Sequence, residues 1–517
     1  MSQELSPRRP RLRHQLLDLD AASAWAARLL RATSGGVWWW AASGVLVLGG
    51  AAAGLHAPTA GAWFWHLANG ELIHSHGLSG TATYLAQPGA ALDLRSWLAD
   101  LALFFIYSGA GLGGLVVAGA VAGAVVGVGL LLAIRAGGRA HPLVVVVAGG
   151  LGLAALAPVL TDLSTELLAI LAAALVLALP AVGRGSRLGA AALVVLVIVW
   201  TNVQADAGVA VLVIWGWLVI AHWGASRTGQ KSAPSWWLIP LTGLALLLSP
   251  RGIGAIGELP LSLGMQGEHP LLAAWSSIGF HPWSARVSEL AGFVLLFSYW
   301  LAGSRLRRAD AYLGLVTAAL AMLWANYLPW FLVVAAVQSC GYLSLAWWPR
   351  ESGSQPDHTS RSGSAVLHSR SGLTAAIPLV IALAVLGSGV ASIARAGGVS
   401  GQTSSQFPVR AARWLADNPT SGAWFTTPGF GDYLSSQFPA GRHLICVDDP
   451  LPLAGSALGQ CQELAVLNSG ALGILRSLHP KLAILPRAAP AATFLRAEGW
   501  KIRYRDATTL ILAPRNL

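Results

Sequence analysis

Long apolar runs recur along almost the whole chain, and they constrain its fold more than any other feature. A helix needs about 20 mostly apolar residues to cross the hydrocarbon core of a bilayer. Lipid offers the backbone no hydrogen-bond partners, so spanning segments of this kind are helices. The pattern therefore predicts an all-α polytopic transmembrane bundle of about eleven spans. The runs are 37–55, 114–134, 141–158, 165–182, 188–201, 206–223, 236–249, 288–303, 310–326, 328–347 and 374–394.

The charge balance agrees with a membrane protein. Only 11% of the residues are charged, whereas a soluble globular protein has roughly 25%. The net charge of +11 comes from short basic clusters between apolar runs, which is the positive-inside pattern rather than a nucleic-acid surface. We therefore expect membrane lipids, and no nucleic acid, as partners. The clusters expected in the cytoplasm are Arg135/Arg139, Arg184/Arg187, Arg227/Lys231, Arg305/Arg307/Arg308 and Arg350/Arg361/Arg370.

One apolar run, 97–110, does not fit this alternation if it crosses the membrane. We interpret it as an interfacial or re-entrant helix that is separated from the next span by closely spaced glycines. The N-terminus is then cytoplasmic and the C-terminus extracytoplasmic. The glycines are Gly109, Gly111, Gly113 and Gly114.

Composition divides the chain into three parts: a basic cytoplasmic arm (1–36), a transmembrane module (37–396) and a soluble α/β domain outside the membrane (397–517). Within the module, 56–96 is an extracytoplasmic loop, and 348–373 is a disordered cytoplasmic linker rich in Ser, Gly and Arg. The soluble domain is of normal size. Its predicted elements are a helix at 408–418 and strands at 482–485 and 510–512.

Polar chemistry concentrates in the stretch 63–98, which lies between the first apolar run and the next one. This stretch mixes aromatic residues with His66, His74 and His76. The histidine spacing matches no standard metal-ligand pattern, so we assign no metal site to it. Two readings of Cys446 and Cys461 stay open: a disulfide in an oxidising compartment, or two buried thiols.

Carboxylates next to membrane spans are candidates for function, because ionisable groups there are costly. On the expected topology nearly all of them lie on the extracytoplasmic side. Taken singly, each is more typical of a solvated loop or a helix cap, and Asp162 before Ser164–Glu166 predicts an ordinary helix start. The set is Glu71, Asp93, Asp100, Asp162, Glu166, Asp206, Glu258, Glu268 and Glu289.

A series of short motifs resembles bacterial polytopic membrane proteins related to the GT-C glycosyltransferases, of the family 39 type. The outer loop contains Trp65-His66-Leu67-x-x-Gly70 and later Trp97-Leu98, similar to that family's Trp-His-Leu-x-x-Gly and Glu-Trp-Leu. The series continues in order along nearly the whole chain. Its further members are Trp200-Thr201-Asn202, Ser249-Pro250-Arg251-Gly252, Trp275-Ser276-Ser277, Gly429-Phe430-Gly431-Asp432-Tyr433-Leu434 and Val447-Asp448-Asp449.

The resemblance implies a bacterial inner-membrane protein that binds a polyprenyl-phosphate sugar at the outer membrane face. In such enzymes an acid of the first outer loop serves as a base or as a metal ligand, so a divalent metal stays open as a cofactor. Several family acids and the family histidine are replaced here, whereas the aromatic frame persists. The replaced positions are Ala62, Ser96, Gln204 and Ala274.

Two functions follow from the resemblance. The first is a GT-C-like glycosyltransferase that moves a sugar from a polyprenyl-phosphate donor to an extracytoplasmic acceptor, with Asp93, Asp100 or Asp206 as the catalytic base. The alternative is an inactive GT-C-like scaffold, or a subunit of a larger membrane complex. A transporter is less favoured, because paired charges deep in the spans are lacking. The expected substrate-binding residues are Trp65, His66, Glu71, Arg95, Trp97, Asn202, Gln204 and Arg251.

Overall fold

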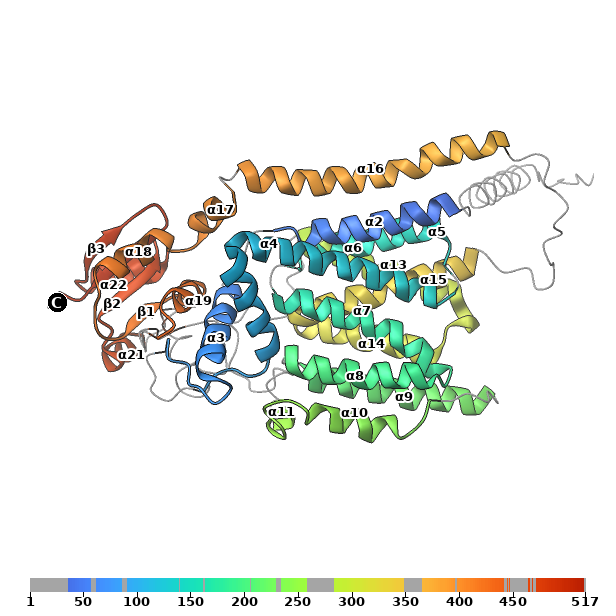
Figure 1. Ribbon diagram of the computed structural model, residues 1–517, viewed down its shortest axis with the longest axis horizontal. Coiled ribbons are helices and arrows are strands. Elements are labelled where there is room, and N and C mark those ends of the chain that lie inside the picture. The colour runs from blue at the N-terminus through green and yellow to red at the C-terminus, as the bar shows by residue number, and fades with distance from the viewer. Residues whose placement is uncertain are drawn as a thin grey trace, which may run out of the picture.

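A helical bundle carries a small α/β domain at one end (Figure 1). The computed structural model describes residues 36–56, 62–85, 91–138, 140–160, 163–204, 206–228, 234–257, 283–347, 365–395, 398–440 and 471–515, with a few single positions between 441 and 470. The basic arm 1–35 and most of the linker at 348–364 lie outside these ranges.

Each predicted apolar run contains a helix. Among the described residues, seven helices are long and apolar enough to cross a membrane, and two apolar helices are shorter. The chain is therefore an integral membrane protein, and the number eleven stays a prediction. The bundle helices are α2 (Gly36–Gly54), α4 (Trp97–Ala136), α5 (Pro142–Val144), α6 (Gly150–Leu156), α7 (Leu163–Gly183), α8 (Arg187–Val203), α9 (Ala207–Thr228), α10 (Leu238–Leu246), α11 (Gly254–Gly257), α13 (Trp283–Ala302), α14 (Arg308–Leu323), α15 (Leu328–Trp347) and α16 (Ala365–Arg395).

Two helices differ from the expected boundaries. The run 236–249 forms only the nine-residue α10, which at 1.5 Å per residue extends about 14 Å and is too short to span a bilayer. Helix α16 begins at Ala365, inside the stretch expected to be a disordered linker. The apolar run 374–394 therefore forms only the later part of α16, and the helix extends back into the expected linker. Helix α16 lies beside α2 at the edge of the bundle (Figure 1).

Helix α4 contains the predicted break. Gly111 has φ 59° and ψ −154°, a conformation that is non-helical and strained for any residue with a side chain. The two halves of α4 therefore point in different directions, and the first half lies against α3 (Ala62–His76) (Figure 1). The structure confirms the break, and the position of 97–110 at the membrane surface stays a prediction.

Glycines allow α2 and α4 to approach backbone to backbone. A Cβ atom on Gly50 or Gly54 of α2 would fall on a carbonyl oxygen of α4, and one on Gly123 or Gly127 would fall on a carbonyl oxygen of α2. Small residues spaced by four favour such close contact in membranes, where lipid provides no hydrophobic drive for helix association. This seam holds the first span against the helix that leads from the outer loop.

We expect Gly123→Ala to destabilise the bundle by about 1–3 kcal/mol, because the added methyl group must push the two helices apart. Gly113→Ala, in the same helix, is the matched control, since a Cβ there meets no atom within 4 Å. The control should be neutral or slightly stabilising, because alanine favours helix over glycine. Unfolding midpoints of the purified variants measure both effects, and equal midpoints would contradict the close seam.

The C-terminal domain is built on one mixed sheet with strand order β1-β2-β4-β3. Strand β1 pairs parallel with β2, while β4 pairs antiparallel with both β2 and β3. The predicted strands lie within β2 and β4, and the predicted helix is α18, so all three expectations are confirmed. The elements are α17 (Gly398–Gln406), α18 (Val409–Asp417), β1 (Trp424–Thr426), α19 (Pro428–Gln437), α21 (Ala471–Leu478), β2 (Leu482–Pro486), α22 (Pro490–Ala497), β3 (Lys501–Arg505) and β4 (Thr509–Ala513).

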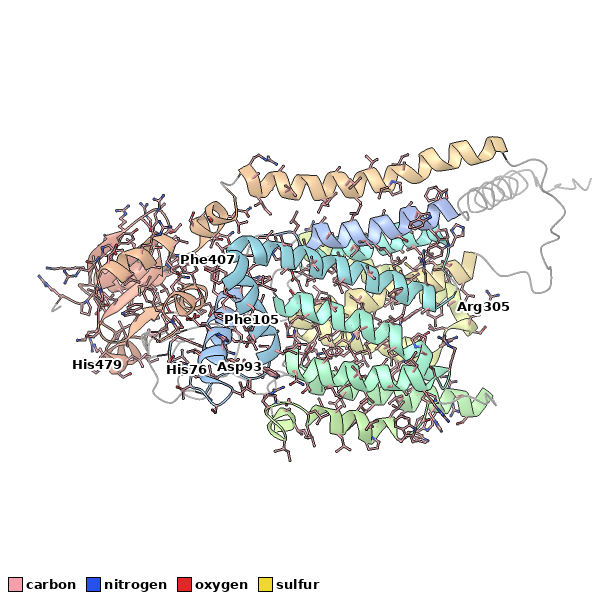
Figure 2. The ribbon with its side chains drawn as sticks, viewed as in Figure 1. His76, Asp93, Phe105, Arg305, Phe407 and His479 are labelled. Atoms are coloured by element: carbon pink, nitrogen blue, oxygen red, sulfur yellow. The ribbon has the colours of Figure 1, made fainter. Side chains whose placement is uncertain are left out.

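This domain shares a hydrophobic core with the outer loop. Phe64 of α3 contacts the rings of Phe407 and Tyr433 edge-on, with centroids 4.8 and 4.9 Å apart. The Thr83 hydroxyl donates a hydrogen bond to the carbonyl oxygen of Pro439, at 2.7 Å. Figure 2 places Phe407 at this junction. The domain is therefore packed against the outer loop.

Candidate functional site

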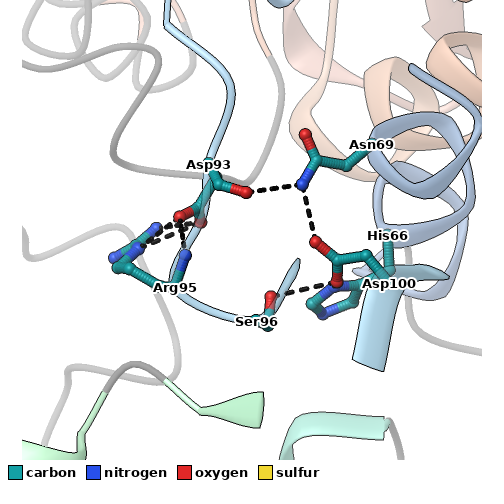
Figure 3. A network of polar contacts seen from close by, with 6 residues as sticks. All are labelled: His66, Asn69, Asp93, Arg95, Ser96 and Asp100. Atoms are coloured by element: carbon teal, nitrogen blue, oxygen red, sulfur yellow. Dashed lines mark hydrogen bonds and ion pairs between the residues drawn. The ribbon is translucent and has the colours of Figure 1, made fainter. Parts of the chain in front are cut away.

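The outer loop and the first half of α4 meet in a buried polar network around Asp100 (Figure 3). Its carboxylate contacts His66 Nδ1 at 2.5 Å and accepts hydrogen bonds from Asn69 Nδ2 at 2.6 Å and from Ser96 Oγ at 3.0 Å. His66 and Asn69 are three residues apart on α3 and so share one face of that helix. The structure thus joins His66 and Asp100, and it adds Asn69, which the sequence analysis missed.

Asp93 forms a buried ion pair with Arg95 in the same loop. The guanidinium donates from Nε at 2.9 Å and from Nη2 at 2.7 Å, and only 2% of Asp93 and 6% of Arg95 are exposed. Burial by itself would raise the pKa of Asp93, but the charge and hydrogen bonds of Arg95 outweigh it and lower this pKa. Asn69 Nδ2 also donates to the carbonyl oxygen of Asp93, which connects the pair to the network.

The ends of α8 and α10 join this cluster from the other side. Trp97 Nε1 donates to Asn202 Oδ1 at 2.8 Å, and the amide of Asn202 donates to the carbonyl oxygen of Leu248 at 2.9 Å. Arg251 lies close enough for its charge to act on Asp93. Residues from three distant parts of the sequence, predicted separately as substrate-binding, therefore converge at one end of the bundle.

Asp206 lies apart from the network, in the turn between α8 and α9. Trp200 Nε1 donates to its Oδ1 at 2.9 Å, and within the described part of the chain Oδ2 has no hydrogen-bond partner. Burial raises the pKa of Asp206 to about 6, although the bond from Trp200 lowers it. Gln204, two residues earlier, is also buried. A carboxylate in this environment exchanges protons near neutral pH.

Two other predicted residues belong to α3. Trp65 is buried and stacks on His66 with ring centroids 4.0 Å apart. Glu71 is half-buried on the same helix, and its backbone carbonyl accepts a hydrogen bond from Ser75. His74 and His76 are exposed at the end of α3, and His74 contacts the ring of Phe104. Trp65 thus supports the Asp100 network, whereas the two exposed histidines lie outside it.

A second acid–base pair was missed by the sequence analysis. His56, just after α2, places Nε2 3.1 Å from Oε1 of Glu166 at the start of α7. The Glu166 side chain is fully buried, while 22% of the His56 side chain is exposed. The His56 ring also meets Trp63 edge-on, one residue from Ala62. The structure thus brings the Glu166 carboxylate to His56, at the start of the outer loop.

The signal for this pair was present but weak. Glu166 follows Ser164 at a spacing that suggests an ordinary helix start, and a single histidine after a span has no motif. The two side chains meet only because α2 and α7 lie close together in the fold, and the sequence does not show which spans are neighbours. In the described ranges, His, Cys, Asp and Glu side chains form no group of three or more that could hold a metal ion, so we derive no step through one.

Comparison with known proteins gives matches among solved structures only. No protein-family model matches the sequence, and a search of curated proteins found no match. The Archaeoglobus fulgidus oligosaccharyltransferase tethered with an acceptor peptide is similar at a TM-score of 0.53 and 11% identity, over 87% of this chain and 69% of that chain. The same archaeal enzyme in complex with an inhibitory peptide and a dolichol-phosphate is similar at a TM-score of 0.52 and 11% identity, over 86% of this chain and 69% of that chain.

ArnT from Cupriavidus metallidurans also matches, with a TM-score of 0.49 and 14% identity over 95% of this chain and 98% of that chain. At such low identities a structural match establishes the fold and not the activity. This chain therefore has the GT-C glycosyltransferase fold.

Proposed function

We propose that this protein is a glycosyltransferase that moves a sugar from a polyprenyl-phosphate donor to an acceptor on the extracytoplasmic side. The GT-C fold supports the reaction class, and the archaeal enzyme in complex with dolichol-phosphate supports a lipid-phosphate donor. The observation that carries the proposal is the contact between His56, at the start of the first outer loop, and Glu166 of α7. A buried carboxylate beside a partly exposed imidazole is an arrangement suited to general base catalysis.

The chemistry follows from that geometry. Glu166 accepts a hydrogen bond from His56 Nε2 and so leaves Nδ1 as the basic nitrogen of the ring. His56 takes the proton of an acceptor hydroxyl as its oxygen attacks the anomeric carbon of the donor sugar. The bond between that carbon and the phosphate oxygen breaks, and the polyprenyl phosphate leaves. Glu166 stabilises the imidazolium that forms, as a buried carboxylate does in other acid–base pairs.

The three aspartates proposed from the sequence remain candidates for the base, and their surroundings rank them. Asp93 and Asp100 are each held by several hydrogen bonds, which suits them to positioning the loop. Asp206 has the raised pKa of a base but is only 3% exposed. We therefore propose His56 as the base, with Asp206 as its strongest rival.

Arg251 is the best candidate for binding the donor phosphate. Arg251 is half-buried, its Nη2 donates a hydrogen bond of 3.5 Å to the carbonyl oxygen of Thr201, and its charge acts on Asp93 of the outer loop. A second guanidinium therefore lies near the Asp93–Arg95 pair, at the end of the bundle where the predicted substrate-binding residues meet. A guanidinium also matches phosphate geometry bidentately.

The disulfide state of the C-terminal domain supports an extracytoplasmic location for it. Cys446 is disulfide-bonded, Cys340 is a buried free thiol in α15, and the third cysteine, Cys461, lies outside the described residues. Disulfides persist in oxidising compartments and are rare in the cytosol. Since the domain packs on the outer loop, both belong on the same side of the membrane.

A transfer assay with purified protein, a synthetic polyprenyl-phosphate sugar and extracted acceptors tests the proposal. Turnover by the wild type is the expected result. Arg251→Gln should raise the KM for the donor by about tenfold or more, because a hydrogen bond to a charged group contributes about 1.5–3 kcal/mol. Arg187→Gln, an exposed arginine at the far end of the bundle, should leave the KM unchanged.

The scaffold reading has one observation in its favour. Asp93 of the outer loop and Asp100 in the first turn of α4 are both buried, and their carboxylates are held by several hydrogen bonds within the protein. Under that reading no polyprenyl-phosphate sugar is turned over, and the protein purifies with partners at fixed stoichiometry. Absence of turnover across a panel of donors, together with such partners, would replace the enzyme proposal by this one.

A further inference from the structure

A second polar site lies at the end of the bundle opposite the outer loop. A cavity of about 600 Å³ opens there between the last turns of α4, α7, α9 and α15 and the first turns of α14. In Figure 2, Arg305 marks this end, while Asp93 marks the outer loop at the other end. The cavity shares no residue with the outer site, so its role is independent of the proposed transfer reaction.

The mouth of the cavity is strongly basic. Five exposed arginines line it, against a single carboxylate, that of Asp310. This carboxylate accepts a hydrogen bond from the Tyr342 hydroxyl at 2.6 Å. In the described part of the chain, no ion pair or side-chain hydrogen bond engages the guanidinium groups of Arg184, Arg227 and Arg308. The arginines are Arg184, Arg227, Arg305, Arg307 and Arg308.

The walls behind these arginines are apolar. Buried side chains of four helices form these walls, so the cavity is charged at its mouth and hydrophobic farther inside. Loop arginines on one side of a membrane protein are expected from the positive-inside rule. That rule does not explain why five of them surround one apolar cavity. The walls include Ile134, Val176, Leu179, Leu313 and Val337.

We infer that this cavity binds an anionic membrane lipid, with the phosphate headgroup at the arginines and the first part of the hydrocarbon chain against the apolar walls. Guanidinium groups bind phosphate through paired N–H donors. A free phosphate would use the arginines but would gain nothing from the apolar walls. The combination of both surfaces at the membrane boundary therefore selects a lipid phosphate.

Native mass spectrometry of the purified full-length protein tests this inference, with phosphatidylglycerol and phosphatidylcholine as probes. Phosphatidylglycerol should remain bound preferentially. Arg227→Gln/Arg308→Gln should weaken its binding by about thirtyfold, since each basic residue near an anionic lipid contributes about 1 kcal/mol. Arg187→Gln is the matched control, because Arg187 is exposed at the same end but does not line the cavity.

A second variant separates lipid from free phosphate. Gly341 lines the cavity, and a Cβ there meets no atom within 4 Å, so Gly341→Leu should enter the apolar part without disturbing the helix. This variant should lose phosphatidylglycerol but still bind inorganic phosphate as the wild type does. Equal binding of both lipids, full lipid binding by Gly341→Leu, or equal losses in the double variant and in the Arg187 control would each overturn the inference.

Discussion

Replacing His56 with glutamine should lower kcat for sugar transfer by about 10²- to 10⁴-fold, the range that a positioned general base contributes. Glutamine retains a hydrogen-bonding side chain of similar length next to Glu166, but it cannot take a proton. The KM for the donor should change little, because the phosphate is assigned to Arg251, which lies with Asp93 and Thr201 rather than with His56. Steady-state kinetics with a polyprenyl-phosphate sugar measure both constants.

The control for this prediction is His74→Gln, which removes an exposed histidine of α3 that does not contact Glu166. Its kcat should equal that of the wild type. A base must be unprotonated to act, so the kcat of the wild type should increase as the pH rises. The plot of kcat against pH for His56→Gln should lack this increase. If His56→Gln keeps most of the activity and Asp206→Asn loses it, the base is Asp206 instead.

Glu166→Gln should also reduce kcat, but by less than His56→Gln, since the imidazole remains and only its orientation and the stabilising charge are lost. The double variant His56→Gln/Glu166→Gln should be no slower than His56→Gln alone. Residues that act as one unit are strongly non-additive in this way. Additive losses would mean that the two side chains act separately.

Replacing Arg95 with methionine should destabilise the protein by about 3–5 kcal/mol, because it leaves the Asp93 carboxylate buried without its partner. Both side chains are almost completely buried, so water cannot replace the lost guanidinium. The double variant Asp93→Asn/Arg95→Met should recover much of this loss, since removal of both charges is far less costly than removal of one. Chemical unfolding of the purified variants gives the free energies.

The pH dependence gives an independent check on this ion pair. The folded pKa of Asp93 lies below its ordinary value of 3.8. The pair therefore stabilises the fold fully above about pH 4, and the contribution declines as the pH falls through the lower folded value. The stability difference between wild type and the double variant should shrink over that acid range. A difference that stays constant there would contradict a charged, buried pair.

Much of the architecture could be predicted from local sequence. Apolar runs identify helices because lipid forces the backbone to satisfy its own hydrogen bonds, and the glycines around Gly111 identify the break in α4. The short apolar runs 482–485 and 510–512 identify two buried strands of the C-terminal sheet. Helix ends were less predictable: α10 ends early, and α16 starts inside the expected linker. End positions depend on packing and capping as well as on apolar content.

The candidate site was only partly predictable. His66, Asp93, Arg95 and Asp100 could be selected because they are polar groups in an otherwise apolar region. The sequence could not predict which of these side chains contact one another. Asp93 forms an ion pair with Arg95 within the loop, whereas Asp100 contacts residues of α3. The sequence distance between His56 and Glu166 is 110 residues, and no motif connects them.

By itself, the sequence determined that this chain is a helical membrane protein with a folded C-terminal domain, because those properties depend on apolar content and periodicity along short segments. The tertiary structure decided which polar groups face one another. Close packing of α2, α4 and α7 brings Glu166 to His56, and the opposite helix ends gather five arginines around one cavity. Such contacts depend on how helices pack in three dimensions, which no local pattern specifies.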